Sequence, residues 1–316
     1  MTHPHLIGQI FNRPHLMTPE LMALSVEFAR NHLLGMSEAM THPKMAIQSY
    51  DGNADDDDDE TDSPLGLKVI SVAGPLVPRT GNLNFCQQMT AYENVAAQVD
   101  AALADPDCAH IAFDIDSPGG AATGAFELAQ KIRAAGMIKP TTAIVNFNAM
   151  SGAYLIASAC NEISVSQSSG VGSIGVIAQH MDVSRMNETM GIKITAVYRG
   201  DKKNNLSPNE PLSDSSLTEL NSMVDRTYGQ FVDAVAGFRS LPKQQVIATQ
   251  AGLYFGQDAV DAGLADRLET PQDAVNRIAA DLQNQRQAAS ASLRHNTIVR
   301  QGLAMRAAQM RLMAML

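Results

Sequence analysis

The sequence predicts an α/β fold built from βαβ units. From Leu67 onward, apolar runs rich in β-branched residues alternate with stretches of helical spacing. Turns that contain glycine or proline, such as Ser117 to Gly120, separate several of these runs. Because strands that alternate with helices pair in parallel, we expect a parallel sheet covered by helices.

The part of the chain before this region is expected to be a separate helical segment, residues 1–48. A helix is predicted over residues 18–40. Its apolar residues recur at roughly helical spacing: Leu21, Leu24, Phe28, Leu33 and Leu34. Residues 49–65 are predicted to be an acidic linker, because the carboxylates between Asp55 and Asp62 repel one another and leave little to bury.

The elements predicted for residues 66–270 alternate along the chain, and we expect these residues to form one domain. Strands are predicted at 69–77, 110–115, 141–145, 162–165, 173–178 and 192–198. Helices are predicted at 92–103, 125–135, 152–159 and 215–238. Residues 271–316 are expected to form a helical tail rich in arginine and methionine, which either docks on the body or binds a partner.

The composition argues against several classes of protein. With 316 residues and a formal net charge of −10, the chain does not have the character of a general nucleic-acid binder. No window approaches the ~20 apolar residues of a membrane-spanning helix, and the N-terminus lacks a signal-peptide pattern. The three cysteines have no metal-type spacing. We therefore expect a cytoplasmic protein that uses no metal or cofactor and binds neither nucleic acid nor membrane.

A glycine turn follows the predicted strand at 110–115. The sequence from Asp114 to Gly120 reads DIDSPGG, and its last residues leave backbone N–H groups with no side chain over them. Bare amides beside a helix start can stabilise a developing oxyanion. The same turn is also an ordinary connection between a strand and a helix, and Asp114 and Asp116 fit capping and turn roles better than catalysis.

A serine stands between a predicted strand and an apolar helix. Residues 149–159 read AMSGAYLIASA, so Ser151 is flanked by small residues at a sharp turn that can expose its Oγ. Such a serine is well placed as a nucleophile, with the Gly152 amide directed at the same oxyanion. The alternative is a serine that caps the N-terminus of the helix.

Two further motifs follow along the chain. Residues 170–176 read GVGSIGV, and glycines among β-branched residues indicate a strand that another backbone approaches closely. Residues 200–208 read GDKKNNLSP, which is a polar loop with the lysine pair Lys202 and Lys203. By itself, a lysine pair in such a loop is usually solvated.

In this order, the four motifs resemble the signal-peptide-peptidase-A class of serine peptidases, family S49, over roughly Leu67 to Leu268. The resemblance implies a ClpP/crotonase-like α/β core and a serine endopeptidase with a Ser–Lys dyad. It implies the following roles: Ser151 as nucleophile, Lys203 as base, Ser173 as the residue that orients the lysine amine, and the backbone of Gly119, Gly120 and Gly152 as the oxyanion hole. The G-x-x-K context from Gly200 to Lys203 favours Lys203 over Lys202.

His180 is an alternative base. ClpP itself resembles this core but uses a Ser–His–Asp triad, and its histidine follows the serine at a broadly comparable distance. No triad aspartate is evident for His180, and the lysine context is intact. A structural or supporting role for His180 is therefore the preferred interpretation.

Within the family, the chain is most similar to the head-maturation, or capsid assembly, proteases of lambda-like phages. The resemblance extends to Asn12-Arg13-Pro14, the acidic linker and His180 in GVIAQH. It implies a homo-oligomer that cleaves capsid-assembly proteins (scaffold, portal or itself) inside the prohead. The alternatives are a soluble host enzyme that degrades signal peptides, an inactive scaffold or minor capsid protein, and a crotonase-like acyl-CoA enzyme.

Overall fold

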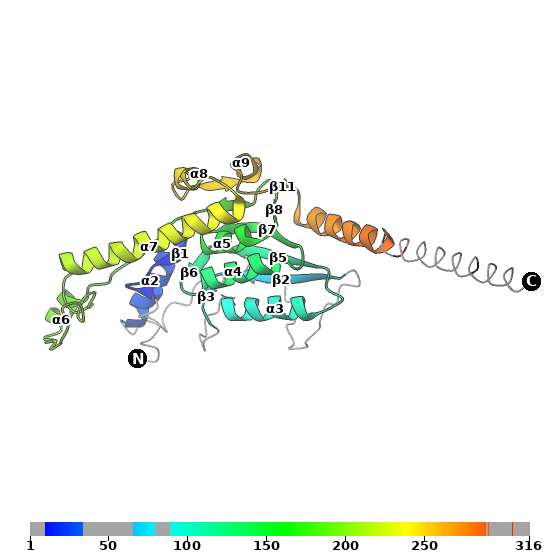
Figure 1. Ribbon diagram of the computed structural model, residues 1–316. Coiled ribbons are helices and arrows are strands. Elements are labelled where there is room, and N and C mark those ends of the chain that lie inside the picture. Colours follow the sequence, from blue (N-terminus) through cyan, green and yellow to red (C-terminus); the bar gives the residue numbers. More distant parts are fainter. Residues whose placement is uncertain (1–9, 34–65, 80–88, 289, 291–304, 306–316) are drawn as a thin grey trace, which may run out of the picture.

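The computed structural model describes residues 10–33, 66–79, 89–288, 290 and 305, and it confirms the α/β fold (Figure 1). Seven strands form the larger sheet: β2 (Leu67–Ala73), β5 (His110–Ser117), β7 (Thr141–Met150), β8 (Glu162–Val165), β9 (Gly170–Gly172), β10 (Leu253–Phe255) and β11 (Arg267–Leu268). All pairs are parallel except β9 with β10. Buried β-branched and aromatic side chains such as Ile70, Val72, Phe113 and Ile115 fit the strands between two covering layers.

Strand β7 divides the sheet at the position that matters for the site. Its first half pairs with β8 from Thr142 to Val145, and its last three residues pair with β9. The sheet therefore opens into two branches, and β7 ends beside β9 at Met150 and Gly172. The turn into the following helix is thus held on a strand that has neighbours on both sides.

Helices cover one face of this sheet. They are α3 (Tyr92–Ala104), α4 (Ala125–Ala135), α5 (Gly152–Ala159) and the long α7 (Asp214–Arg239) (Figure 1). Every residue of α5 is buried, since the helix lies between the sheet and α7. A helix that is almost entirely apolar and buried on every side, as α5 is, belongs inside a core.

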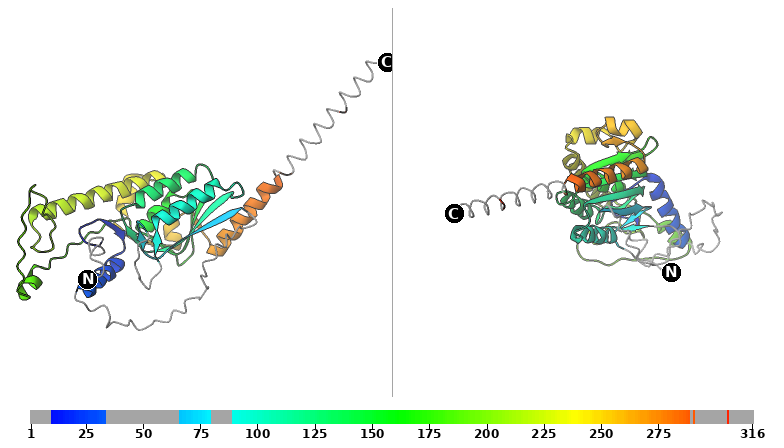
Figure 2. Two further views of the ribbon diagram at one scale, coloured as in Figure 1. Left: turned by 90° about the horizontal axis from the view of Figure 1, so that it is seen from below. Right: turned by 90° about the vertical axis from the view of Figure 1, so that its right-hand side faces the viewer.

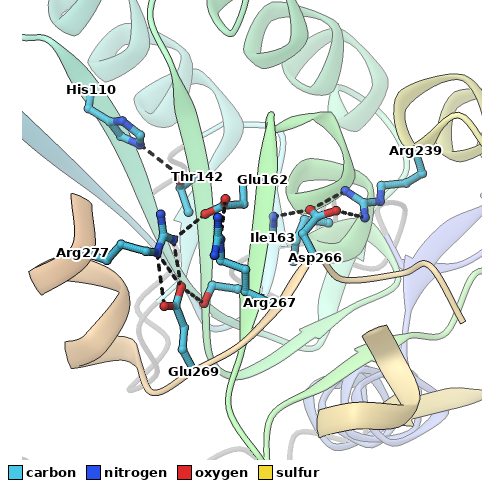
Figure 3. A network of polar contacts seen from close by, with 10 residues as sticks. His110, Thr142, Glu162, Ile163, Arg239, Asp266, Arg267, Glu269 and Arg277 are labelled. Atoms are coloured by element: carbon cyan, nitrogen blue, oxygen red, sulfur yellow. Dashed lines mark hydrogen bonds and ion pairs between the residues drawn. The ribbon is translucent and has the colours of Figure 1, made fainter. Parts of the chain in front are cut away.

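A C-terminal helix over residues 271–288 packs on the other face of the sheet (Figure 2). Ala274, Ile278 and Leu282 meet the sheet residues Leu67, Ala112 and Ile144. Ion pairs fix this helix to the sheet edge, because Arg277 bonds both Glu162 and Glu269, the latter at 2.8 Å (Figure 3). Of the two alternatives for the predicted tail, residues 271–288 therefore follow the first, since they dock on the body.

A second, four-stranded sheet contains β1 (His15–Met17), β6 (Gly119–Ala121), β3 (Leu76–Val77) and β4 (Thr90–Ala91), in the order β1-β6-β3-β4. Strand β1 is antiparallel to β6, with Leu16 opposite Gly120. The helix α2 (Pro19–Leu33) follows β1 directly. At β1, the N-terminal segment is thus part of the same body as the sheet and is not a separate unit.

Several predicted elements differ from the structure. The strand at 69–77 is two strands, β2 and β3, because the chain turns at Gly74 with φ 67° and Pro75 follows. Residues 173–178 are not a strand, apart from an isolated bridge between Ile177 and His15. The prediction at 192–198 was also wrong, because these residues are exposed and pair with no strand in the part of the chain that the structure describes.

The helix predicted over 18–40 runs from Pro19 to Leu33 in the structure. Residues 34–40 and the acidic linker lie outside the described residues. Three short helices were not predicted: α6 (Ser184–Thr189), α8 (Lys243–Ala248) and α9 (Gly256–Asp261). Within the described ranges, each helix is too short or too polar to cross a membrane.

Candidate active site

Ser151 occupies a backbone conformation that side chains rarely adopt, with φ 53° and ψ −115°, between β7 and α5. Its N–H donates to the Gly172 carbonyl at 2.8 Å, and its carbonyl accepts from the Leu155 N–H at 3.0 Å. Positive φ at a residue other than glycine costs about 1–3 kcal/mol and is concentrated at functional sites. The conformation therefore supports a functional reason for a serine here.

The side chain of Ser151 does not cap the helix. It makes no capping hydrogen bond, and its Oγ is buried without a hydrogen-bond partner among the described residues. A buried hydroxyl normally finds a partner, because leaving it unpaired costs free energy. The capping alternative is wrong, and the unpaired Oγ is available to a group outside the described residues.

Glycine amides gather beside Ser151. A Cβ atom on Gly152 would lie 3.5 Å from the Gly120 nitrogen, and one on Gly119 would lie 3.0 Å from the Gly152 nitrogen. Only glycine fits at Gly120, where a Cβ would lie 2.0 Å from the Leu76 carbonyl oxygen. The Gly119 N–H donates to Ser117 Oγ at 3.1 Å, so Gly120 and Gly152 are the two amides left to face an oxyanion.

Ser173 lies close to Ser151 in the fold. It directly follows β9, whose last residue Gly172 pairs with Met150, the residue before Ser151. Ser173 is also held at positive φ, 53°, and its N–H donates to the Gly252 carbonyl at 2.9 Å. The two serines therefore stand on adjacent strand ends, each fixed by a backbone hydrogen bond.

Lys203 is exposed in a turn of the segment between β9 and α7. Its N–H donates to the Gly200 carbonyl at 3.0 Å, and no described hydrogen bond joins its amine to Ser151. The end of this turn is anchored at Leu206, whose N–H donates to Ser216 Oγ at 3.1 Å and whose carbonyl accepts from Asn12 Nδ2 at 2.9 Å. Within one chain, the structure does not bond the predicted nucleophile to the predicted base.

His180 is held by the N-terminal segment. Its Nδ1 lies 2.8 Å from Asn12 Oδ1, and its Nε2 is buried without a partner among the described residues. No described carboxylate bonds the ring. Asp114 and Asp116 lie on β5: burial raises the pKa of Asp114, and Asp116 accepts from Asn148 at 3.3 Å. The described residues therefore do not form a Ser–His–Asp triad.

The strand β1 is the part of the site that sequence reasoning missed. The Leu16 carbonyl oxygen would lie 2.2 Å from a Cβ on Gly119 and 3.0 Å from one on Gly152, directly beside the glycine amides. Leu16 itself is fully buried. A three-residue strand gives no alternation pattern, and the sequence signal there was limited to the Asn12-Arg13-Pro14 resemblance.

Comparison with known proteins connects this site with a family. Residues 133–285 match the model of Peptidase family S49. The chain is 33% identical over 282 residues to the capsid assembly protease C of Escherichia phage lambda, covering 86% of this chain and 64% of that protein. It is 31% identical over 294 residues to the head-tail preconnector protein GP5 of Enterobacteria phage P21, covering 88% of this chain and 57% of that protein.

The chain thus spans less than two thirds of the length of these two relatives. The matched range from 133 to 285 includes Ser151, Gly152, Ser173, His180 and Lys203. The parallel sheet and the serine turn at the end of β7 are consistent with these sequence matches. The comparisons therefore place residues 133–285 of this chain in a match to peptidase family S49.

Proposed function

We propose that this chain is a serine endopeptidase in which Ser151 is the nucleophile and Lys203 is the base. One observation carries the proposal: the Ser151 Oγ, on a turn of positive φ, has no described hydrogen-bond partner and lies beside the Gly120 and Gly152 amides. A nucleophile next to preorganised N–H donors is the arrangement that acyl transfer requires.

The reaction would proceed through an acyl-enzyme. Ser151 Oγ attacks the carbonyl carbon of a peptide bond while its proton passes to the neutral Lys203 amine, and the oxyanion is held by the Gly120 and Gly152 amides. The C–N bond breaks and the lysine ammonium returns the proton to the departing amine. Water then hydrolyses the ester with the same lysine as base. Ser173, on the adjacent strand end, would orient the lysine amine.

Lys203 would act from a neighbouring subunit. A lysine is a base at neutral pH only where burial lowers its pKa, whereas the Lys203 side chain is exposed in the single chain. Large apolar side chains precede it on the same segment and are also exposed: Met190, Ile192, Ile194, Val197 and Tyr198. Exposed apolar groups on one segment indicate an interaction surface. A second copy of the chain would cover them and bring its serine site to the lysine.

The substrates would be proteins of capsid assembly. The two relatives described above are named for capsid assembly and for the head-tail preconnector. By this likeness, the chain would cleave scaffold, portal or its own tails in an assembling phage head. The deep position of Ser151 fits this role, since a sealed nucleophile limits unwanted cleavage.

Co-expression with scaffold, portal and capsid proteins tests this function. Mass spectrometry of the products should show new peptide termini with the wild-type chain and none with Ser151→Ala. The same cleavage pattern from both chains would show that another protease is responsible.

A further inference from the structure

Residues 12–18 lie in a slot between two other segments of the chain. On one side they pair with β6, and on the other side with residues 177–179. Besides the ladder with β6, these backbone hydrogen bonds hold them: Asn12 N–H to Gln179 O at 2.8 Å, His15 N–H to Ile177 O at 2.8 Å, Ile177 N–H to His15 O at 3.1 Å, and Thr18 N–H to Pro118 O at 3.1 Å. This is how an extended peptide binds when it adds a strand to a sheet.

The register places one carbonyl of this segment at the glycine amides. Hydrogen-bonded pairs in an antiparallel ladder recur every second residue. Thr18 bonds to Pro118, so Leu16 and Gly120 form the next such pair in the register. The Leu16 carbonyl oxygen is the atom that a Cβ on Gly119 or Gly152 would meet, at 2.2 Å and 3.0 Å. It therefore lies where the oxyanion of a substrate would form.

The Leu16 side chain closes the site. Leu16 and Ser151 are both fully buried, and the Leu16 Cβ would lie 3.3 Å from a Cβ on Gly152. A peptide substrate that needs contact with Ser151 Oγ cannot reach it while Leu16 stays in place. The segment and an incoming peptide therefore compete for the same position.

We propose that residues 12–18 are an intramolecular pseudosubstrate that fills the peptide-binding slot and keeps the site latent. Its ligand class follows from the occupant: an extended peptide, antiparallel to β6, with a large apolar residue at the position of Leu16. The inference rests on the proposed function in so far as it treats the slot as the substrate site. A tethered segment acts at an effective concentration on the order of millimolar, so a free peptide competes poorly until the segment loosens.

A binding experiment without chemistry tests this. The full chain carrying Ser151→Ala is titrated with a fluorescent peptide of residues 11–19, with and without Leu16→Ala. The substitution removes the buried anchor, so we expect at least tenfold tighter peptide binding. The matched control is Leu24→Ala, because Leu24 lies on α2 and is 60% exposed. It should bind the peptide with the same affinity as the parent chain, which carries Ser151→Ala alone.

Two further arms complete the experiment. Asn12→Gly keeps the positive φ of 62° and removes the amide that bonds Leu206 and His180, so it should also raise peptide affinity if Leu16→Ala does not fold. A peptide with aspartate in place of Leu16 should bind at least tenfold more weakly. Equal affinity of parent, Leu16→Ala and Asn12→Gly, or no binding by any of them, overturns the inference. Neither result depends on Ser151 acting as a nucleophile.

Discussion

The N–H of Ser151 donates to the Gly172 carbonyl across 2.8 Å, at the point where β7 ends and α5 begins. This bond links the serine turn to β9, the strand that leads directly into Ser173. The backbone strain at Ser151 is thus held by a ladder hydrogen bond from a buried strand. The same contact fixes where the Oγ lies relative to the Gly120 and Gly152 amides.

Removing the hydroxyl of Ser151 should abolish peptidase activity. We expect Ser151→Ala to reduce turnover on the order of 10⁶-fold, as deletion of a nucleophile does elsewhere. Ser158→Ala is the matched control, because Ser158 is also buried but bonds the Leu155 carbonyl within α5, at 2.8 Å. Steady-state cleavage of a peptide substrate measures both. Similar losses from the two substitutions would point to a folding defect instead of catalysis.

Lys203→Ala should reduce turnover about as severely as Ser151→Ala does, and Lys202→Ala should have little effect on turnover.

If the lysine acts across subunits, co-expressed Ser151→Ala and Lys203→Ala chains should regain activity. With random mixing, half of the sites have Ser151 and half of those have Lys203, so about one quarter should be intact. Co-expressed activity that stays at the level of the single variants would contradict a site shared between subunits. A severe loss of turnover in Lys202→Ala would assign the role of base to Lys202 instead.

His180→Gln separates the alternative base from a supporting residue. A general base contributes about 10²–10⁴-fold, so loss in that range would assign the role to His180. We expect a loss below about tenfold, because the ring bonds Asn12 and no described carboxylate supports it. Turnover of the purified variant at neutral pH decides between the two.

Two glycine substitutions should change stability in opposite directions. Gly172 has φ 113°, and a Cβ there would lie 2.5 Å from the Gly252 carbonyl oxygen. We expect Gly172→Ala to lower the free energy of unfolding by about 1–3 kcal/mol or more. Gly229 lies within α7 with open space around it, so Gly229→Ala should raise the free energy of unfolding by about 0.5–1 kcal/mol. Denaturant unfolding measures both, and equal shifts would refute the strained turn.

The docked N-terminal strand should loosen in acid because of His15. Burial lowers the pKa of His15 below its usual value near 6.5; the bond to the Ile10 carbonyl opposes this, and the charge of Arg13 adds to the lowering. The folded state thus binds the proton less readily than the unfolded state. Stability is complete above the unfolded pKa and is lost as pH falls below it, toward the folded pKa.

Thermal unfolding of wild type and His15→Gln between about pH 7.5 and 5 checks this. The wild-type midpoint should fall more steeply with acid than that of His15→Gln. Burial also lowers the pKa of His110, but both chains contain His110, so their difference isolates His15. Parallel curves would show that His15 does not contribute.

Much of the fold was predictable from local pattern, and part of the site was not. The strand at His110–Ser117 and the helix at Gly152–Ala159 follow from buried apolar runs with clear turn residues between them. The roles of Ser151 and Lys203 came from a resemblance and stay predictions. The place of Leu16 depends on long-range pairing with Gly120, which no local pattern encodes. The segment at 192–198 was predicted to be a strand from its apolar, β-branched residues, but among the described residues it is exposed and pairs with no strand.

The most direct test of the central claim is covalent labelling of the assembled chain with a fluorophosphonate probe, followed by peptide mapping. A nucleophilic Ser151 predicts one adduct on the peptide that contains Ser151, and its loss in Ser151→Ala. An assembled, folded wild-type chain that stays unlabelled at Ser151 would contradict the proposal and favour a non-peptidase on the same fold.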